Sequence, residues 1–365
     1  MIKFLTALLA LALLAVILQD AFEVMLLPRR VHRRFRLMGV YFRACWAAWG
    51  ALAGRIKDPP RREHVLSLFG PLFMLLLFAV WAGMLIGAFG LLEWALQGGG
   101  ASPVLEAGTG IGFLAVVIGY LPVLYQLFSR REAHVIQLDA RAGSPPTAGT
   151  MLCRHAEGGG LDKLDELLRE WEVWGSELLE SHLSYPMLAY YRSQHDNQSW
   201  LAALAVVMDA CALILVGVEA LPPLQARMTF SMTRQVLVEM AESFRSKPSR
   251  YDGGDRLPPE VWDRMVAEFA EAGLAWTEDP GARDTLAALR ATYEPLLDGL
   301  SRKLLLSLPG WMPAGKVVDH WARGHRGLIA SRLMEELSDR SAPRLVPATR
   351  GGPLWKRLRQ RLRDE

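Results

Sequence analysis

Two glutamates, Glu93 and Glu106, are the only charged residues in two long apolar stretches, residues 65–96 and 104–128. A short uncharged segment, residues 97–103, joins these stretches and contains three consecutive glycines. In an oligomer, carboxylates repeated around an axis form rings that attract cations. Two interpretations follow: the glutamates surround the outer mouth of a pore, or they lie at the membrane–water interface and contact water.

Small residues recur in the second apolar stretch. Gly108 and Gly112 form a GxxxG pair on one helix face, and such a pair allows two membrane helices to approach closely. Further along, Gly119 precedes Pro122 by three residues, a combination that permits a bend. These four positions are candidates for gating a pore, and tight helix packing alone is the alternative.

Outside these stretches, the chemically reactive residue types form no catalytic or metal-binding pattern. His195 and Asp196 are adjacent and leave a membrane-bound hydrolase as a weak alternative, because no nucleophile motif accompanies them. The chain has three widely separated cysteines: Cys45, Cys153 and Cys211. Their spacing matches neither a zinc site nor a disulfide framework. We therefore predict no catalytic residue, no metal ion and no cofactor.

The chain of 365 residues divides into an apolar first third and a charged remainder. Hydrophobic residues make up 51% of the whole and concentrate before about residue 128, which predicts membrane helices followed by a soluble domain. An anchor, residues 1–28, has an apolar run at 4–18 that is followed by arginines. Because basic residues favour the cytoplasmic side, this uncleaved anchor is predicted to have its N-terminus outside.

Three membrane crossings are predicted: the anchor and the two helices of a hairpin at residues 65–128. Residues 29–64 are basic on both sides of an apolar segment that contains Trp46 and Trp49. A crossing would leave one basic cluster outside, so an amphipathic helix on the inner membrane surface is favoured. The predicted topology places the N-terminus outside and the C-terminal domain inside.

After the hairpin, residues 129–160 contain glycines and prolines that predict a linker. Residues 161–345 have apolar residues at helical spacing and no alternating strand pattern, which predicts an all-α cytoplasmic domain. Within it, residues 200–218 are apolar apart from Asp209 and are long enough to cross a membrane. A charge at the bilayer centre costs about 2.5–3.5 kcal/mol. A central helix of the soluble domain is therefore favoured over a fourth crossing.

The final segment, residues 346–365, places leucines and a tryptophan among basic residues, which predicts a short amphipathic helix. Its candidate membrane-binding residues are Lys356, Arg357, Arg359, Arg361 and Arg363. Each contributes about 1 kcal/mol to binding at an anionic inner leaflet. The net charge of the whole chain is only +3, which provides no general field for nucleic acid. The predicted partner of this segment is the lipid bilayer.

Two longer segments resemble known proteins. "VLEAGTGIGFLAVVIGYLPVLYQLFSRRE", followed by "LDARAGSPPTAG", is similar to the inner helix and post-membrane linker of bacterial potassium-channel-like proteins. "YYRSQHDNQSWLAALAVVMDACALILVGVEALPP" resembles part of the helical tail of the same family. The resemblance implies a homo-oligomeric ion channel in the bacterial inner membrane, with potassium or another monovalent cation as the transported ion.

The family carries its filter on a pore helix and a Thr-x-Gly-x-Gly-Asp-like loop between the two membrane helices. Rings of backbone carbonyls in that loop replace the hydration shell of the ion. Here residues 97–103 span at most about 25 Å when fully extended, which is too short for both features. We therefore predict a channel-like frame without the filter-bearing loop. The alternative is a non-conducting membrane-anchored scaffold or sensor with a helical interaction domain.

Overall fold

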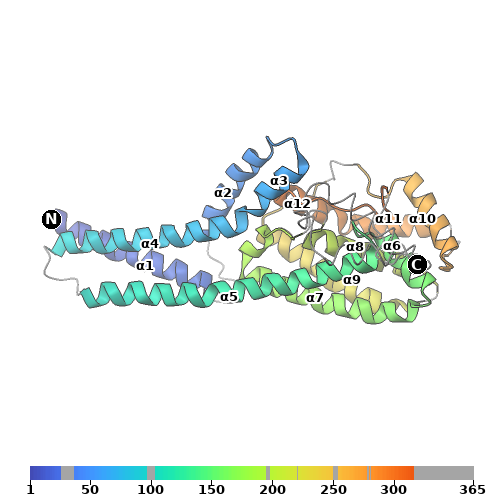
Figure 1. The fold of residues 1–365 in the computed structure, drawn as a ribbon, viewed down its shortest axis with the longest axis horizontal. Coiled ribbons are helices and arrows are strands. Elements are labelled where there is room, and N and C mark those ends of the chain that lie inside the picture. The colour runs from blue at the N-terminus through green and yellow to red at the C-terminus, as the bar shows by residue number, and fades with distance from the viewer. Residues whose placement is uncertain are drawn as a thin grey trace, which may run out of the picture. The chain divides into compact units, whose positions relative to one another are not determined.

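The computed structural model describes residues 1–25, 37–96, 103–194, 198–219, 221–249, 254–277, 279 and 281–315. Every regular element among these residues is a helix (Figure 1), and Val218 and Trp276 form an isolated strand-like bridge. The predicted all-α class is therefore confirmed for this part of the chain. The basic segment at residues 346–365 lies outside the described residues.

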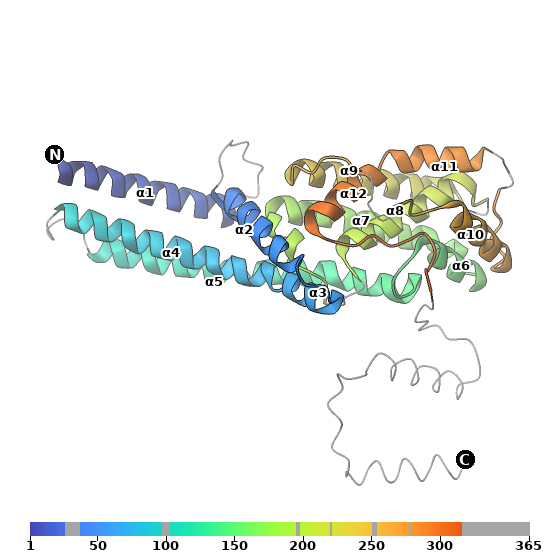
Figure 2. The ribbon, with the colours of Figure 1, turned by 90° about the horizontal axis from the view of Figure 1, so that it is seen from above.

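Three long apolar helices run in roughly the same direction: α1 (Ile2–Met25), α4 (Phe69–Leu96) and α5 (Pro103–Ala142) (Figures 1 and 2). Helix α1 packs along α4, where Nε1 of Trp81 donates a hydrogen bond to Oδ2 of Asp20 at 3.2 Å. A carboxyl group among apolar side chains requires such a donor, because burying it without a partner is costly.

Four helices of the described part are long and apolar enough to cross a membrane by length and composition. They cover Ile2–Val24, Pro59–Leu96, Leu105–Ala142 and Trp200–Gly217. These helices indicate a multi-pass membrane protein. The last of them differs from the others, because 89% of its residues are buried by the rest of the chain. It is the segment that the sequence predicts as the central helix of the soluble domain.

Two shorter helices, α2 (Leu37–Ala53) and α3 (Pro59–Ser67), precede α4 in the chain. Helix α2 coincides with the apolar segment for which an amphipathic helix was predicted. It packs against the first turns of α4, and the hydroxyl of Tyr41 donates a hydrogen bond to the carbonyl oxygen of Phe73 at 3.1 Å. This contact ties α2 to the start of α4.

Helix α5 is 40 residues long and continues beyond residue 128, where the sequence predicted its end. The extension is stabilised as a helix because one of its faces packs on the rest of the chain. The buried residues of this face recur at helical spacing: Arg131, Glu132, Val135, Leu138 and Ala142. The helix stops where Gly143 adopts a left-handed φ of 88°. The predicted linker, residues 129–160, thus contains the end of α5 and a further helix, α6 (Ala148–Glu157).

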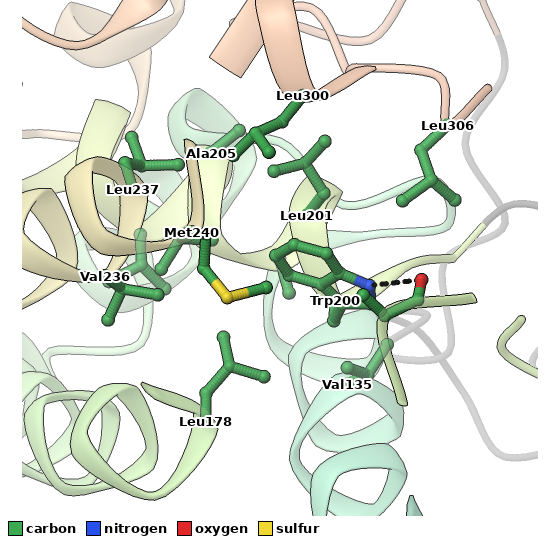
Figure 3. Packing of buried hydrophobic residues seen from close by; sticks show 14 of the residues in the cluster. Val135, Leu178, Trp200, Leu201, Ala205, Val236, Leu237, Met240, Leu300 and Leu306 are labelled. Carbon is green, nitrogen blue, oxygen red and sulfur yellow. Dashed lines mark hydrogen bonds between the residues drawn. The ribbon is translucent and has the colours of Figure 1, made fainter. Parts of the chain in front are cut away.

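The remaining helices form a helical domain together with α6 and the end of α5. They are η1 (Leu161–Lys163), α7 (Leu164–Ser184), η2 (Pro186–Tyr190), α8 (Trp200–Gly217), α9 (Pro223–Ser243), α10 (Pro259–Glu271), α11 (Ala282–Ala291) and α12 (Glu294–Leu304). Helix α8 lies at the centre and contacts α5, α6, α7, α9, α11 and α12. Figure 3 shows Trp200 and Leu201 of α8 packed among side chains of α5, α7 and α9.

Candidate functional site on helix α5

The first half of α5 is almost uncovered by its own chain. Only 11% of the residues in its most apolar part are buried, and none of the described side chains before Tyr120 is. Large apolar side chains on this half are 57–70% exposed: Leu105, Ile111, Leu114 and Ile118. A continuous exposed apolar surface of this kind marks contact with lipid or with another protein.

The glycines of α5 lie on this open surface. A Cβ atom built at Gly108, Gly112 or Gly119 would meet no atom within 4 Å. The close helix packing that the GxxxG pair predicts is therefore not made by any described part of the same chain. These positions are therefore open to a helix from outside the described part of the chain, such as one from a second copy.

Pro122 lies inside α5, which continues beyond it to Ala142. Proline has no backbone N–H, so the carbonyl of Ile118 lacks its usual helical donor, and the helix is weakened there. Burial of α5 begins close by, at Tyr120, and continues at Leu124 and Phe128. Pro122 therefore lies near the boundary between the uncovered half of the helix and the half that packs on the helical domain.

Glu93 and Glu106 are both exposed, at the end of α4 and in the first turn of α5. Neither side chain forms an ion pair or hydrogen bond with a described residue. The structure does not bring the two carboxylates into contact, so both predicted roles stay predictions. A carboxylate in the first turn of α5 is favoured electrostatically in either role, because it lies at the positive end of the helix dipole.

Arg131 joins α5 to the helical domain, a role that the sequence did not reveal. Its guanidinium donates hydrogen bonds to the carbonyl oxygens of Leu188 at 2.9 Å and Tyr191 at 2.8 Å, and pairs with Glu132 at 2.8 Å. The residue is only 4% exposed. No local sequence pattern marks this role, because the carbonyl partners lie 57 and 60 residues away along the chain.

His182 of α7 faces the same arginine. Its Nδ1 donates to the carbonyl oxygen of Leu178 at 2.8 Å, and its Nε2 lies 3.4 Å from Nη1 of Arg131. Burial, followed by the nearby Arg131 charge, lowers the pKa of His182 to about 3. The imidazole is therefore neutral at physiological pH and accepts a hydrogen bond from the arginine.

A second junction connects α2 and α4 to the helical domain through aromatic rings. The ring of Trp46 lies 4.8 Å from that of Phe69 and 5.0 Å from that of Tyr190, centroid to centroid. Arg192 lies beside it, with its guanidinium 5.9 Å from the Trp46 ring and 3.3 Å from a carboxylate oxygen of Glu63. The end of α5 and the start of α4 are thus both fixed to the same helical domain.

The one acidic residue of α8, Asp209, is fully buried and has protein partners. It pairs with Arg256 and accepts a hydrogen bond from the hydroxyl of Tyr293 at 2.7 Å. Burial raises the pKa of Asp209 to about 6, against the opposing effect of the Arg256 cation. These contacts explain how an apolar core helix accommodates a carboxyl group.

The other predicted site residues fall outside this arrangement. His195, Asp196 and the five basic residues of the C-terminal segment lie outside the described residues. Among the described residues, no group of three or more His, Cys, Asp or Glu side chains is placed to hold a metal ion.

Comparisons with protein-family models, with curated proteins and with solved structures found no match for this chain. The kinship with potassium-channel-like proteins is therefore a prediction that depends on the two segments quoted above. The site itself is defined by geometry: an uncovered apolar helix with open glycines, fixed at its buried end to a helical domain.

Proposed function

We propose that this protein is a homo-oligomeric, channel-like integral membrane protein in which α5 helices from several copies surround an axis. Potassium or another monovalent cation crosses along that axis. The observation that carries the proposal is the open surface of α5, with Gly108 and Gly112 facing no described neighbour. The membrane is a bacterial inner membrane, with the N-terminus outside and the helical domain in the cytoplasm.

Helix packing in a bilayer favours this assembly. Lipid tails are as apolar as leucine, so membrane helices associate through close contact of small residues rather than through hydrophobic burial. On this chain α1 already occupies one side of α4, whereas most of the first half of α5 has no helix against it. The α5 surface is therefore the face on which we place the next copy.

The proposed pore lacks a potassium filter. Only residues 97–102 lie between Leu96 at the end of α4 and Pro103 at the start of α5. Rings of carbonyls that strip water from an ion need a loop and a supporting helix, for which this segment is too short. We therefore expect weak discrimination between potassium and sodium.

Two measurements test the proposal on purified full-length protein. In a background without native cysteines, Gly112→Cys is expected to cross-link between copies in detergent and in liposomes. Val16→Cys, on an exposed position of α1, is the matched control and should cross-link much less. Equal cross-linking of both variants would contradict assembly through α5.

Ion passage is measured separately, as potassium and sodium flux into proteoliposomes compared with empty vesicles. Flux above the empty vesicles that is lost in Gly112→Leu supports conduction along α5. Flux equal to that of empty vesicles would show that the protein does not conduct these ions.

A second candidate function is favoured by the short α4–α5 connection itself. Without a filter, the same oligomer can serve as a non-conducting membrane anchor whose helical domain binds a partner. Cross-linking at Gly112 without any flux is the result that selects this candidate.

A further inference from the structure

A cavity of about 550 Å³ lies between α2, η2, the segment after α9 and the end of α12. Its lining is strongly basic and contains five cationic side chains: Arg43, Arg245, Lys247, Arg302 and Lys303. No aspartate or glutamate of the described part of the chain lines it. A concentration of positive charge without acidic partners favours an anionic ligand.

Aromatic contacts hold this cavity together at its inner side. Trp46 of α2 and Tyr190 of η2 both line it, and their rings lie 5.0 Å apart. Arg43 is close enough to Tyr190 to oppose the rise of its pKa, which burial drives to about 12. The cavity therefore combines a basic rim with an apolar and aromatic floor.

The basic side chains near the end of α12 do not serve as hydrogen-bond donors to the last carbonyl groups of that helix. Cations at a helix C-terminus commonly satisfy its last carbonyl groups. Here Nε1 of Trp46 donates to the carbonyl oxygen of Lys303 at 2.8 Å. Arg192 donates to the next two carbonyl oxygens, those of Leu304 at 2.7 Å and Leu305 at 3.0 Å. The lysine and arginine side chains of the cavity are not needed for this purpose.

The last carbonyl groups of α9 also have donors, here the backbone N–H groups of residues 244–246. No described carboxylate forms an ion pair with Arg43, Arg245, Lys247 or Lys303. Ser249 is also among the residues that line the cavity, and its buried hydroxyl oxygen has no hydrogen-bond partner among the described residues. Four cations are thus available to a ligand, and a polar atom without a partner lies beside them.

Two residues with a left-handed backbone conformation lie at the cavity. Arg245 and Leu305 are the two non-glycine residues with positive φ in the described part of the chain, at 50° and 55°, and both line the cavity. Both residues lie just after a helix, α9 or α12, where the left-handed conformation commonly ends the helix, so the two helix ends meet at the cavity. Gly299 permits the close approach of α12, because a Cβ atom there would collide with the carbonyl oxygen of Lys247.

We propose that this cavity binds a phosphate-bearing anion, the headgroup of an anionic phospholipid. Arginine and lysine side chains with a serine hydroxyl are the groups that recognise phosphate oxygens. The aromatic wall favours a lipid over a free ion, because Trp46 also contacts Phe69, the first residue of the membrane-length helix α4. The proposal requires membrane association and is independent of ion conduction.

The test measures lipid binding to the purified full-length protein in neutral detergent by native mass spectrometry, with short-chain phosphatidylglycerol as the probe. The variant Arg245→Gln with Lys247→Gln removes two exposed side chains of the cavity. We expect its dissociation constant to rise about ten-fold, as the loss of two charge-assisted contacts implies. The control, Lys163→Gln with Arg227→Gln, removes the same charge from exposed positions outside the cavity and should bind like the unaltered protein.

A second arm titrates inorganic phosphate into the same proteins, once without lipid and once with the lipid bound. Lipid binding that the cavity variant weakens and phosphate does not displace supports a headgroup as the ligand. Phosphate binding that the same variant abolishes supports the phosphate chemistry and identifies a soluble source. Equal affinities of the cavity variant and the control for the lipid, with no phosphate binding, would overturn the proposal, and the flux and cross-linking results would be unaffected.

Discussion

Helices α5 and α8 are both long and apolar enough to cross a membrane, yet the chain covers them very differently. The rest of the chain buries 89% of the residues of α8, and only 11% of those in the most apolar part of α5. The carboxyl group of α8, Asp209, has an arginine and a tyrosine as partners, whereas Glu106 of α5 is exposed. Apolar length alone therefore does not distinguish a core helix from a membrane helix.

The difference lies in what supplies the apolar surroundings. Burial of apolar surface contributes about 25 cal/mol for each Å² removed from water. Helix α8 obtains this from six neighbouring helices of its own chain. The first half of α5 does not obtain it from the described part of the chain, which leaves lipid or another protein as its surroundings. Variants at matched positions of the two helices test this contrast.

The largest effect is expected at the ion pair of α8. Arg256→Leu leaves the carboxyl group of Asp209 buried without its cation, and removing one partner of such a pair costs about 3–5 kcal/mol. We expect the melting temperature of the full-length protein in detergent, followed by circular dichroism, to fall by roughly 10 °C. Arg227→Leu, at an exposed position of α9, is the control. Equal melting temperatures of the two variants would show that the pair is dispensable.

A smaller effect is expected when bulk is added to each helix in turn. Ala205 of α8 is fully buried, so Ala205→Leu overpacks the core and lowers the free energy of unfolding by about 1–3 kcal/mol. Gly112→Leu on α5 meets open space and leaves the unfolding of the helical domain unchanged. Its effect is instead on assembly, measured as oligomer mass by light scattering. Destabilisation by Gly112→Leu to the same extent as by Ala205→Leu would contradict the contrast.

The junction of α5 with the helical domain should depend on pH. The pKa of His182 is lowered to about 3 in the folded protein from an ordinary value of 6.5, so the unfolded chain binds the extra proton in the window between these values. Stability from this group is therefore present above pH 6.5 and is lost as the pH falls toward 3. The slope is at most about 1.4 kcal/mol per pH unit.

The check is a comparison of melting temperatures from pH 7 to pH 4. His182→Gln keeps a polar side chain and removes the titration, so its melting temperature should fall less steeply with decreasing pH. A matched substitution at the half-buried His134 of α5 should leave the original slope. Identical slopes for all three proteins would assign the acid sensitivity to other groups.

The smallest effect on stability is expected at the exposed carboxylates. Glu93→Gln with Glu106→Gln removes two solvated charges, and substitutions at such positions change the free energy of unfolding by less than about 0.5 kcal/mol. If the carboxylates surround a pore mouth, the same variant lowers cation flux into liposomes several-fold at low salt. Unchanged flux in a conducting protein would identify them as interfacial residues only.

Local patterns predicted many of the helices and the interior position of α8. A charge at the middle of an apolar segment marks α8, because such a charge is costly in lipid and has partners in a protein core. Sequence reasoning ended α5 too early, at residue 128, because glycine and proline further along suggested a linker. The buried face of residues 129–142 outweighs that composition.

The sequence by itself determined the helical class, the positions of the apolar helices and the short connection between α4 and α5. Only the tertiary structure decided which helices are covered, which arginines are buried, and that α2 meets α12. The contact between Trp46 and Lys303 joins residues 257 positions apart. Helical periodicity acts over three or four residues, so it specifies which face is apolar and not which distant segment covers it.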